Sequence, residues 1–284
     1  MTGRDIIACA RTGTGKTASF TIPLIDRLKE HSDVVGARAL IIVPTRDLAM
    51  QTLQVVKDLS RYTDLRRSLI VGGHNYEGQF ESLAANPDII IATPGRLMQI
   101  LDETAFSLKR VEYLVFDEAD SLFELGFSEQ ILSILKKVSS KRQTLLFSAT
   151  IPQELSEFAS AGLNDYRLVR LDTEYTMPDK ALLHFLICRT TEKLSLLVLL
   201  LQRHANSKTI VFCPTKQVVE MLVNLLPHFQ IQTVGVYGKM DSDVRMEFMD
   251  KFRRNHARVL VVTDLAARGL DIPSVQNVVN FGYP

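Results

Sequence analysis

The stretch DIIACARTGTGKTASF, residues 5–20, decides the fold class. It begins with a short apolar run, passes through a glycine-rich turn and continues into a segment with helical periodicity. A glycine-rich turn between a strand and a helix points successive backbone N–H groups at a phosphate chain, and the helix N-terminus adds its positive end. The stretch therefore predicts a phosphate-binding loop in a domain of alternating strands and helices.

The loop itself is ARTGTGKT, residues 10–17. Lys16 would reach the β- and γ-phosphates of a nucleotide, and the Thr17 hydroxyl would ligate Mg²⁺. The strict motif has glycine six places before the lysine, where this chain has Ala10. A flexible glycine turn is the alternative, but strand, loop, Lys-Thr and helix occur here in the required order. The predicted nucleotide-binding residues are Ala10, Arg11, Thr12, Gly13, Thr14, Gly15, Lys16 and Thr17.

A second strand end carries an unusual density of like charge. In VFDEADSLFELGF, residues 115–127, Asp117 and Glu118 directly follow the apolar run YLVF. Such a pair needs a neighbouring cation, which Lys16 and a divalent ion would supply. In phosphate-loop enzymes the first carboxylate of this strand end holds Mg²⁺ and its neighbour positions the attacking water. The alternative, a solvated turn, suits Asp120 or Glu124 taken alone.

Strand-like apolar runs alternate with helical patterns along the whole chain. Those in the first part are ALIIVP (39–44), SLIVGG (68–73), DIIIATP (88–94), VEYLVFDEA (111–119) and QTLLFSAT (143–150). Continuous apolar runs of this kind are typical of strands covered on both faces, as in parallel sheets with crossover helices. The pattern predicts a doubly wound α/β domain.

The polar stretch LDTEYTMPDKA, residues 171–181, interrupts this alternation and predicts a linker. Beyond it, strands are expected at LHFLICR (183–189), TIVFCP (209–214), QTVGVYG (232–238), RVLVVTD (258–264) and NVVNFG (277–282), with helical patterns at 191–204 and 215–226. A chain of 284 residues exceeds one ordinary domain of about 100–200 residues. We therefore expect a first domain at 1–172, a linker at 173–181 and a second domain at 182–284, with a ligand-binding cleft between the domains.

Composition excludes several other classes of protein. No apolar run is long enough to cross a membrane, and residues 1–13 lack the apolar core of a signal peptide. The three cysteines, Cys9, Cys188 and Cys213, lie in apolar runs without zinc-site spacing, so we expect all three to be reduced core residues. The net charge is +1 and neither half is strongly basic. Binding of nucleic acid would therefore depend on local contacts and not on overall charge.

Eight short motifs occur in a fixed order: ARTGTGKT (10–17), PTRDLAMQ (44–51), GG (72–73), TPGR (93–96), DEAD (117–120), SAT (148–150), IVFCPTK (210–216) and VTDLAARGLDIP (262–273). In these motifs the chain resembles the DEAD-box RNA helicases of superfamily 2. The sequences around these motifs, such as LFELGFSEQ (122–130) and ANPDIIIATPGRL (85–97), resemble those of the nucleolar members that act in maturation of the large ribosomal subunit.

The resemblance implies two tandem RecA-like domains, each a mostly parallel sheet with helices on both faces, and an RNA-stimulated ATPase that uses ATP and Mg²⁺. Lys16 and Thr17 would bind phosphate and magnesium, Asp117 would hold the metal, and Glu118 would be the general base. Ser148 and Thr150 would hydrogen-bond to Asp120. Asp271 in the second domain would contact the ribose.

RNA is the implied partner, held through its backbone and largely without regard to base sequence. The implied contacts are Pro44, Thr45, Arg46, Gly72, Gly73, Thr93, Gly95 and Arg96 in the first domain, with Arg245 and Thr263 in the second. Glycines, threonine hydroxyls and single arginines at strand ends suit phosphates and sugars, which carry no direct sequence information. A monomer that associates with pre-ribosomal particles in the nucleolus is expected, with nucleus or cytoplasm as the wider alternatives.

The chain also departs from the family pattern. The aromatic-and-glutamine motif that reads adenine lies upstream of the phosphate loop in the family, and the paired arginines lie beyond NFGYP; neither is found in this sequence. Ser242 stands where the family usually has glutamine.

Two kinds of function are therefore expected: an ATP-dependent RNA helicase whose sequence is incomplete, or a non-catalytic RNA clamp that keeps the fold. Lys16, Asp117 and Glu118 favour the first. The amino-acid sequences of the DEAD and SAT motifs disfavour a DNA translocase.

Overall fold

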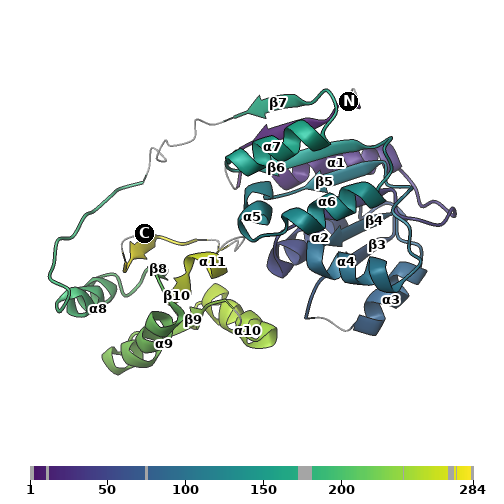
Figure 1. Ribbon diagram of the computed structural model, residues 1–284. Coiled ribbons are helices and arrows are strands. Elements are labelled where there is room, and N and C mark those ends of the chain that lie inside the picture. The colour runs from purple at the N-terminus through teal and green to yellow at the C-terminus, as the bar shows by residue number, and fades with distance from the viewer. Residues whose placement is uncertain are drawn as a thin grey trace. The chain divides into compact units, whose positions relative to one another are not determined.

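The computed structural model describes residues 3–10, 13–73, 76–171, 181–238, 240–267, 272 and 274–282. The chain divides into two compact units, Met1–Pro178 and Asp179–Pro284 (Figure 1). This division falls within the predicted linker 173–181, of which only residue 181 belongs to the described residues. The limits 1–172 and 182–284 stay a prediction.

The first unit is built on a seven-stranded sheet in which every pairing is parallel. Its strands are β1 (Ile6–Cys9), β2 (Ala39–Ile42), β3 (Arg67–Ile70), β4 (Ile89–Ala92), β5 (Tyr113–Phe116), β6 (Gln143–Ser148) and β7 (Arg167–Arg170). The order across the sheet is β3-β4-β2-β5-β6-β1-β7. The central strands β2, β4 and β5 are buried along their whole length, because helices cover both faces.

Helices α1 (Lys16–Leu28) and α2 (Arg46–Leu59) cover one face of this sheet, and their apolar side chains share one core cluster with it. The other face is covered by α3 (Tyr76–Ala84), α4 (Pro94–Glu103), α5 (Ala119–Glu124), α6 (Ser128–Lys137) and α7 (Gln153–Gly162). Figure 1 shows α4, α5, α6 and α7 on the near side of the sheet. Continuous apolar strands flanked by amphipathic helices thus give the α/β layering that their sequence predicts.

The second unit has a parallel sheet of four described strands in the order β11-β8-β10-β9. These strands are β8 (Thr209–Cys213), β9 (Thr233–Val236), β10 (Val259–Thr263) and β11 (Asn277–Asn280). Helices α8 (Lys193–Arg203) and α9 (Lys216–Leu225), followed by the 3₁₀ turn Leu226–Phe229, pack on one face. Helices α10 (Ser242–Arg253) and α11 (Asp264–Ala267) pack on the other. The predicted fold class is confirmed for both units.

Two predictions need correction, and one strand was not predicted. LHFLICR (183–189) is not a strand: the segment has no neighbouring strand among the described residues, and its apolar side chains are exposed. Cys188 lies in this segment and is exposed, so the expectation that all three cysteines are core residues is wrong, although Cys9 and Cys213 are buried. β7 is an additional strand that the sequence analysis did not predict. It pairs with β1 at the sheet edge, and one-sided pairing leaves its residues largely exposed.

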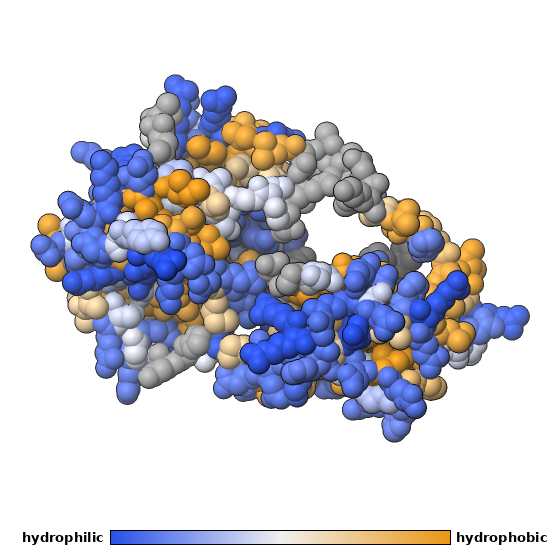
Figure 2. Space-filling view, turned by 180° about the vertical axis from the view of Figure 1, so that it is seen from behind, coloured by the Kyte–Doolittle hydropathy of each residue, from blue (hydrophilic) through white to orange (hydrophobic). Residues whose placement is uncertain are grey.

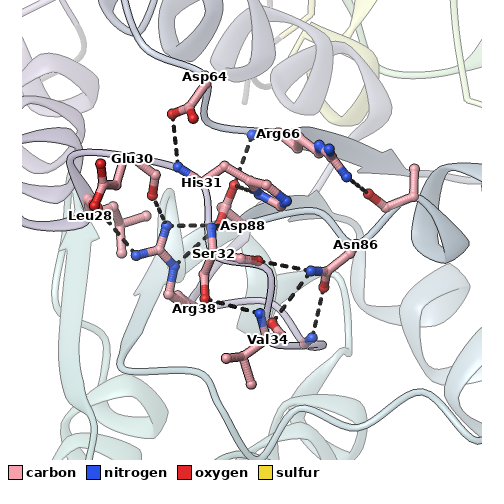
Figure 3. Close-up of polar contacts among 12 residues, drawn as sticks. Leu28, Glu30, His31, Ser32, Val34, Arg38, Asp64, Arg66, Asn86 and Asp88 are labelled. Atoms are coloured by element: carbon pink, nitrogen blue, oxygen red, sulfur yellow. Dashed lines mark hydrogen bonds and ion pairs between the residues drawn. The ribbon is translucent and has the colours of Figure 1, made fainter.

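A buried ion network ties together the amino ends of β2, β3 and β4 (Figure 3). Asp88, only 2% exposed, accepts bonds from Arg38 Nη2 at 2.7 Å and from the backbone N–H groups of Arg66 at 2.9 Å and Ser32 at 3.2 Å. His31 Nδ1 lies 2.8 Å from Asp88 Oδ2. Burial alone would raise the pKa of Asp88, but these bonds outweigh it and hold the pKa below its ordinary value.

The surface is mostly hydrophilic on the face that Figure 2 shows, with hydrophobic residues in separate patches. Among the described residues, no helix has the length and apolar character needed to cross a membrane.

Candidate functional site

The carboxyl edge of the first sheet is where the predicted residues gather, and the strand order divides it into two halves. β5, β6 and β1 are consecutive, so the ends that carry DEAD, SAT and the phosphate loop lie side by side. β3, β4 and β2 are also consecutive, and their ends carry GG, TPGR and PTR. Ligands of open α/β sheets bind outside the carboxyl ends of the strands.

The phosphate loop connects β1 to α1. Gly13 and Gly15 have φ of 80° and 88°, a left-handed conformation that favours glycine. Gly15 is the N-cap residue of α1, which places Lys16 in the first helical turn. The Ala10 N–H donates to the Ser148 carbonyl at 3.0 Å and joins the loop to the end of β6. Gly13 and Thr14 are exposed, Thr17 is partly buried, and Arg11 and Thr12 lie outside the described residues.

Lys16 is the decisive residue of this half. Its side chain is buried, with 9% exposure of the residue, and Nζ has no hydrogen-bond partner within the described part of the chain. A buried ammonium without hydrogen bonds is unfavourable unless an anion compensates it. Its position at a glycine loop and a helix N-terminus therefore points to a phosphate ligand.

Asp117 and Glu118 lie directly beyond β5. Asp117 is 4% exposed and its pKa is raised to about 6, chiefly by burial; Lys16 opposes this rise and Glu118 adds to it. The Glu118 N–H donates to Asp117 Oδ1 at 3.0 Å. Glu118 has a φ of 50°, which is uncommon for a residue with a side chain and holds it at the start of α5. The buried Asp117 carboxylate thus interacts with the Lys16 ammonium, and the partly buried Glu118 follows it directly in the chain.

Asp120, Ser148 and Thr150 form a connected set. The Asp120 N–H donates to Ser148 Oγ at 3.1 Å. Asp120 Oδ2 accepts from the Thr150 N–H at 3.0 Å and from the Thr150 hydroxyl at 2.9 Å. The contacts that the resemblance implied are present in the structure, and they link the end of β6 to α5.

A magnesium ion fits the donors of this half. Thr17 offers a hydroxyl and Asp117 a buried carboxylate, and hard divalent ions prefer such oxygen ligands. A divalent cation would also favour the charged form of Asp117 and so oppose the rise in its pKa that burial causes. The residues present are therefore compatible with a metal held between Thr17, Asp117 and the phosphates of a nucleotide.

The other half of the edge carries the predicted RNA residues at the ends of three neighbouring strands. Thr45 caps α2, its hydroxyl accepting from the Leu48 N–H at 3.3 Å, and Arg46 begins that helix. Arg46 Nε and Nη1 are buried and have no hydrogen-bond partner within the described residues. Thr93 is the N-cap residue of α4 but makes no capping bond with its side chain. Pro44 is buried, Thr45, Arg46, Thr93 and Arg96 are partly buried, and Gly72, Gly73 and Gly95 are exposed.

In the second unit, two predicted RNA residues lie on adjoining elements. Thr263 ends β10, and Arg245 on α10 donates from Nη2 to the Ala266 carbonyl at 3.0 Å. Asp271, the expected ribose contact, lies outside the described residues. The structure thus brings Arg245 next to the segment that follows Thr263.

The sequence analysis did not identify Tyr76 and Gln79, both on α3, as contacts of the predicted RNA residues. The Arg96 guanidinium carbon lies 4.6 Å from the Tyr76 ring centroid. The Gln79 side chain bonds both the N–H and the carbonyl of Val71, at 3.1 and 3.0 Å, just before Gly72. The one feature of the sequence that could have pointed to them is that both follow the GG motif within a few residues.

Two family models match this chain. One is DEAD/DEAH box helicase, over residues 1–158, and the other is Helicase conserved C-terminal domain, over residues 192–284.

The chain belongs to the DEAD/DEAH box helicase family.

Curated relatives within this helicase family match its full length. DEAD-box ATP-dependent RNA helicase 29 of Oryza sativa subsp. indica is 51% identical, with 100% of this chain and 34% of the relative covered. ATP-dependent RNA helicase DDX54 of Mus musculus is 46% identical, with 100% of this chain and 33% of the relative covered. The chain spans about a third of the length of these curated relatives.

Solved DEAD-box structures are similar as well. S. cerevisiae Dbp5 bound to RNA and ADP BeF3 is 28% identical, has a TM-score of 0.87 and matches over 99% of this chain and 71% of that chain. A DEAD box protein from the hyperthermophile Methanococcus jannaschii is 30% identical, with a TM-score of 0.56 over 99% of this chain and 75% of that chain. The two parallel-sheet units are therefore RecA-like helicase domains.

Proposed function

We propose that the chain is the core of an ATP-dependent RNA helicase, in which ATP binding draws the two units together on a single RNA strand and hydrolysis releases it. The observation that carries this proposal is the buried Lys16 ammonium without a hydrogen-bond partner among the described residues, at the end of a glycine loop. Such a group is stabilised when a triphosphate occupies the loop.

The residues near Lys16 have distinct roles in this proposal. Lys16 holds the β- and γ-phosphates, while Thr17 and Asp117 hold Mg²⁺, which neutralises charge on the transferred phosphoryl group. Glu118 orients the attacking water and accepts its proton. Asp120, held by Ser148 and Thr150, links the DEAD strand end to the SAT strand end, so a change at the phosphates can be transmitted along this edge.

Binding of RNA uses the neighbouring half of the edge. Arg46 and Arg96 in the first unit, and Arg245 and Thr263 in the second, would bind phosphates of one strand from two sides. A straight duplex cannot satisfy both units, so we expect closure to bend one strand and release its partner. Affinity should fall with salt at a log–log slope of about −0.7 for each neutralised phosphate and change little with base sequence. Contacts with 2′-hydroxyls would favour RNA over DNA.

The cellular role that we propose is in processing of ribosomal RNA. The chain acts as a monomer on pre-ribosomal particles in the nucleolus. Support comes from the segments LFELGFSEQ and ANPDIIIATPGRL, which resemble the nucleolar members of the family.

The test combines RNA affinity with ATP turnover. Affinity for single strands of several sequences is measured with and without a non-hydrolysable ATP analogue, with Lys16→Met as the variant that cannot respond. We expect the analogue to tighten binding of RNA to the wild-type chain alone. Affinity that is indifferent to nucleotide, or that varies strongly with base order, would overturn the two-unit clamp.

Glu118→Gln separates the enzyme from the non-catalytic clamp. The variant keeps the size of the side chain but cannot accept a proton, so RNA-stimulated turnover should fall by a factor on the order of 10² to 10⁴ while ATP affinity is kept. A wild-type chain that binds RNA in a nucleotide-dependent way, with no turnover for Glu118→Gln to lower, would favour the clamp.

A further inference from the structure

Helix α3 begins three residues after Gly73 with Tyr76, whose side chain contacts both ends of α4. The Arg96 guanidinium, in the first turn of α4, lies over the Tyr76 ring at 4.6 Å from its centroid. The Tyr76 hydroxyl donates to Glu103 Oε2, in the last turn of α4. Phe80 packs against the same ring edge-on, with centroids 4.7 Å apart and an interplanar angle of 88°. The ring is thus held from three sides.

The same helix also holds the segment that leads into the GG motif. Gln79 is buried, and its amide bonds both backbone groups of Val71, which directly precedes Gly72. These paired bonds anchor the end of β3 to α3. One helix therefore adjoins both the glycine pair and Arg96, two of the predicted phosphate contacts.

Stacking matters for an arginine that binds a phosphate. Its guanidinium is planar, and its N–H donors point outward in that plane. An aromatic ring on one face attracts the cation and restricts its rotation, but leaves the in-plane donors available. Less freedom is then lost when a phosphate binds, so preorganisation raises affinity without a new contact to the ligand.

We propose that Tyr76 is a positioning residue of the RNA site, whose ring orients the Arg96 guanidinium toward a phosphate of the bound strand. This inference rests on the proposed function, since it assumes that Arg96 contacts RNA. The ring does not touch RNA itself; it acts through Arg96, and Glu103 and Phe80 hold it in place. The aromatic ring, and not the hydroxyl, is the group that the role requires.

The test uses variants that keep or remove the ring. Tyr76→Phe and Tyr76→Trp keep it, and their RNA affinity should stay within about twofold of wild type. Tyr76→Leu and Tyr76→Met remove it, and we expect affinity to fall about 3- to 10-fold. The KM for RNA in ATP turnover should rise with kcat unchanged, because the nucleotide residues are not affected.

The chain offers a matched control pair. Arg61 lies over the ring of Tyr62 at 5.4 Å, but Tyr62 follows α2 and is 91% exposed, away from the strand ends that carry the RNA residues. Tyr62→Leu removes an arginine–tyrosine contact outside the predicted RNA site and should leave RNA affinity and its salt dependence unchanged.

A double-mutant cycle with Arg96→Ala decides the mechanism. If Tyr76 acts through Arg96, Tyr76→Leu adds no further loss of RNA affinity in the Arg96→Ala background. An equal loss of RNA affinity on adding Tyr76→Leu to the wild type and to Arg96→Ala would overturn the inference. So would a result in which Arg96→Ala weakens RNA binding but Tyr76→Leu does not. Wild-type protein that fails to bind RNA would instead overturn the proposed function. Should Tyr76→Leu fail to fold, Tyr76→Met provides the same comparison with a flexible side chain.

Discussion

Asp88 and Lys16 are both buried charges of the first unit, but they lie at opposite edges of its sheet. Asp88, at the amino edge, accepts hydrogen bonds from Arg38 and from two backbone N–H groups and contacts His31 (Figure 3). Lys16, at the carboxyl edge, has no hydrogen-bond partner for Nζ within the described residues. A buried charge that has all its hydrogen bonds is costly to break and belongs to the fold, whereas a buried charge without hydrogen bonds is available to a ligand.

Asn86 and Arg46 show the same contrast. At the amino edge, Asn86 accepts from the Gly36 N–H at 2.9 Å and donates to the Ser32 carbonyl at 2.9 Å, so the loop before β2 is held by side chains that are themselves bonded. At the carboxyl edge, Arg46 keeps two buried nitrogens without hydrogen bonds in the described structure. Unsatisfied polar groups of this kind are rare in folded proteins and call for an explanation, which a phosphate ligand provides.

The largest effect on stability is expected at Asp88. Asp88→Ala leaves the partly buried Arg38, whose side chain is 12% exposed, without its carboxylate and should lower the free energy of unfolding by about 3–5 kcal/mol. Asp102→Ala is the control, because its 3.4 Å bridge to Lys137 is largely exposed and should contribute less than about 1 kcal/mol. Urea unfolding of both variants measures the difference. Equal losses would remove the distinction between the edges.

Lys16→Met should have the reverse effect: it should weaken nucleotide binding without lowering stability. Nucleotide affinity should fall by about 2–5 kcal/mol, because a buried charge partner of the phosphates is lost. The free energy of unfolding without ligand should stay equal or rise, because a buried ammonium that makes no hydrogen bond in the described structure is replaced by an apolar side chain of similar length. Nucleotide titration and urea unfolding of the same preparation test both halves. A marked loss of stability would show that Lys16 supports the fold.

Acid should weaken the Asp88 network in a defined direction. Its hydrogen bonds hold the pKa of Asp88 below the ordinary value, so the folded state binds this proton less readily than the unfolded state. The stabilisation is therefore complete above about pH 4 and is lost as pH falls through the lower, folded value. We expect the difference in unfolding free energy between wild type and Asp88→Asn to be smaller at about pH 3 than at about pH 5. A difference that grows on acidification would contradict the assignment.

The smallest effect distinguishes two threonines that are both predicted to contact RNA. The Thr45 hydroxyl caps α2, so Thr45→Ala should lower stability by about 1 kcal/mol. The Thr93 hydroxyl makes no capping bond in the described structure, so Thr93→Ala should change stability by less than about 0.5 kcal/mol while still weakening RNA binding. Thermal unfolding alongside RNA titration separates the two contributions. Similar stability losses would mean that Thr93 also supports its helix.

Much of the fold follows from local patterns. The apolar runs that became β2, β4 and β5 are readable because strands buried on both faces must be continuously apolar. LHFLICR (183–189) has the same apolar character but lies exposed, because a strand also needs a partner for its backbone groups. β7 was missed because its sequence, RLVR, has arginine at both ends and is largely exposed, so it lacks a continuous apolar run.

The sequence by itself determined the chemistry of the site: Lys16 and Thr17 after a glycine loop, and Asp117 and Glu118 after a buried strand. Only the tertiary structure decided which strand ends are neighbours, because periodicity reports how each segment is buried but not what lies beside it. The order β3-β4-β2-β5-β6-β1-β7 separates the nucleotide residues from the predicted RNA residues along one edge. The stack of Arg96 on Tyr76 joins two helices, and the bonds to Asp88 join segments up to 57 residues apart. Contacts across such distances depend on chain packing, which no local pattern in the sequence encodes.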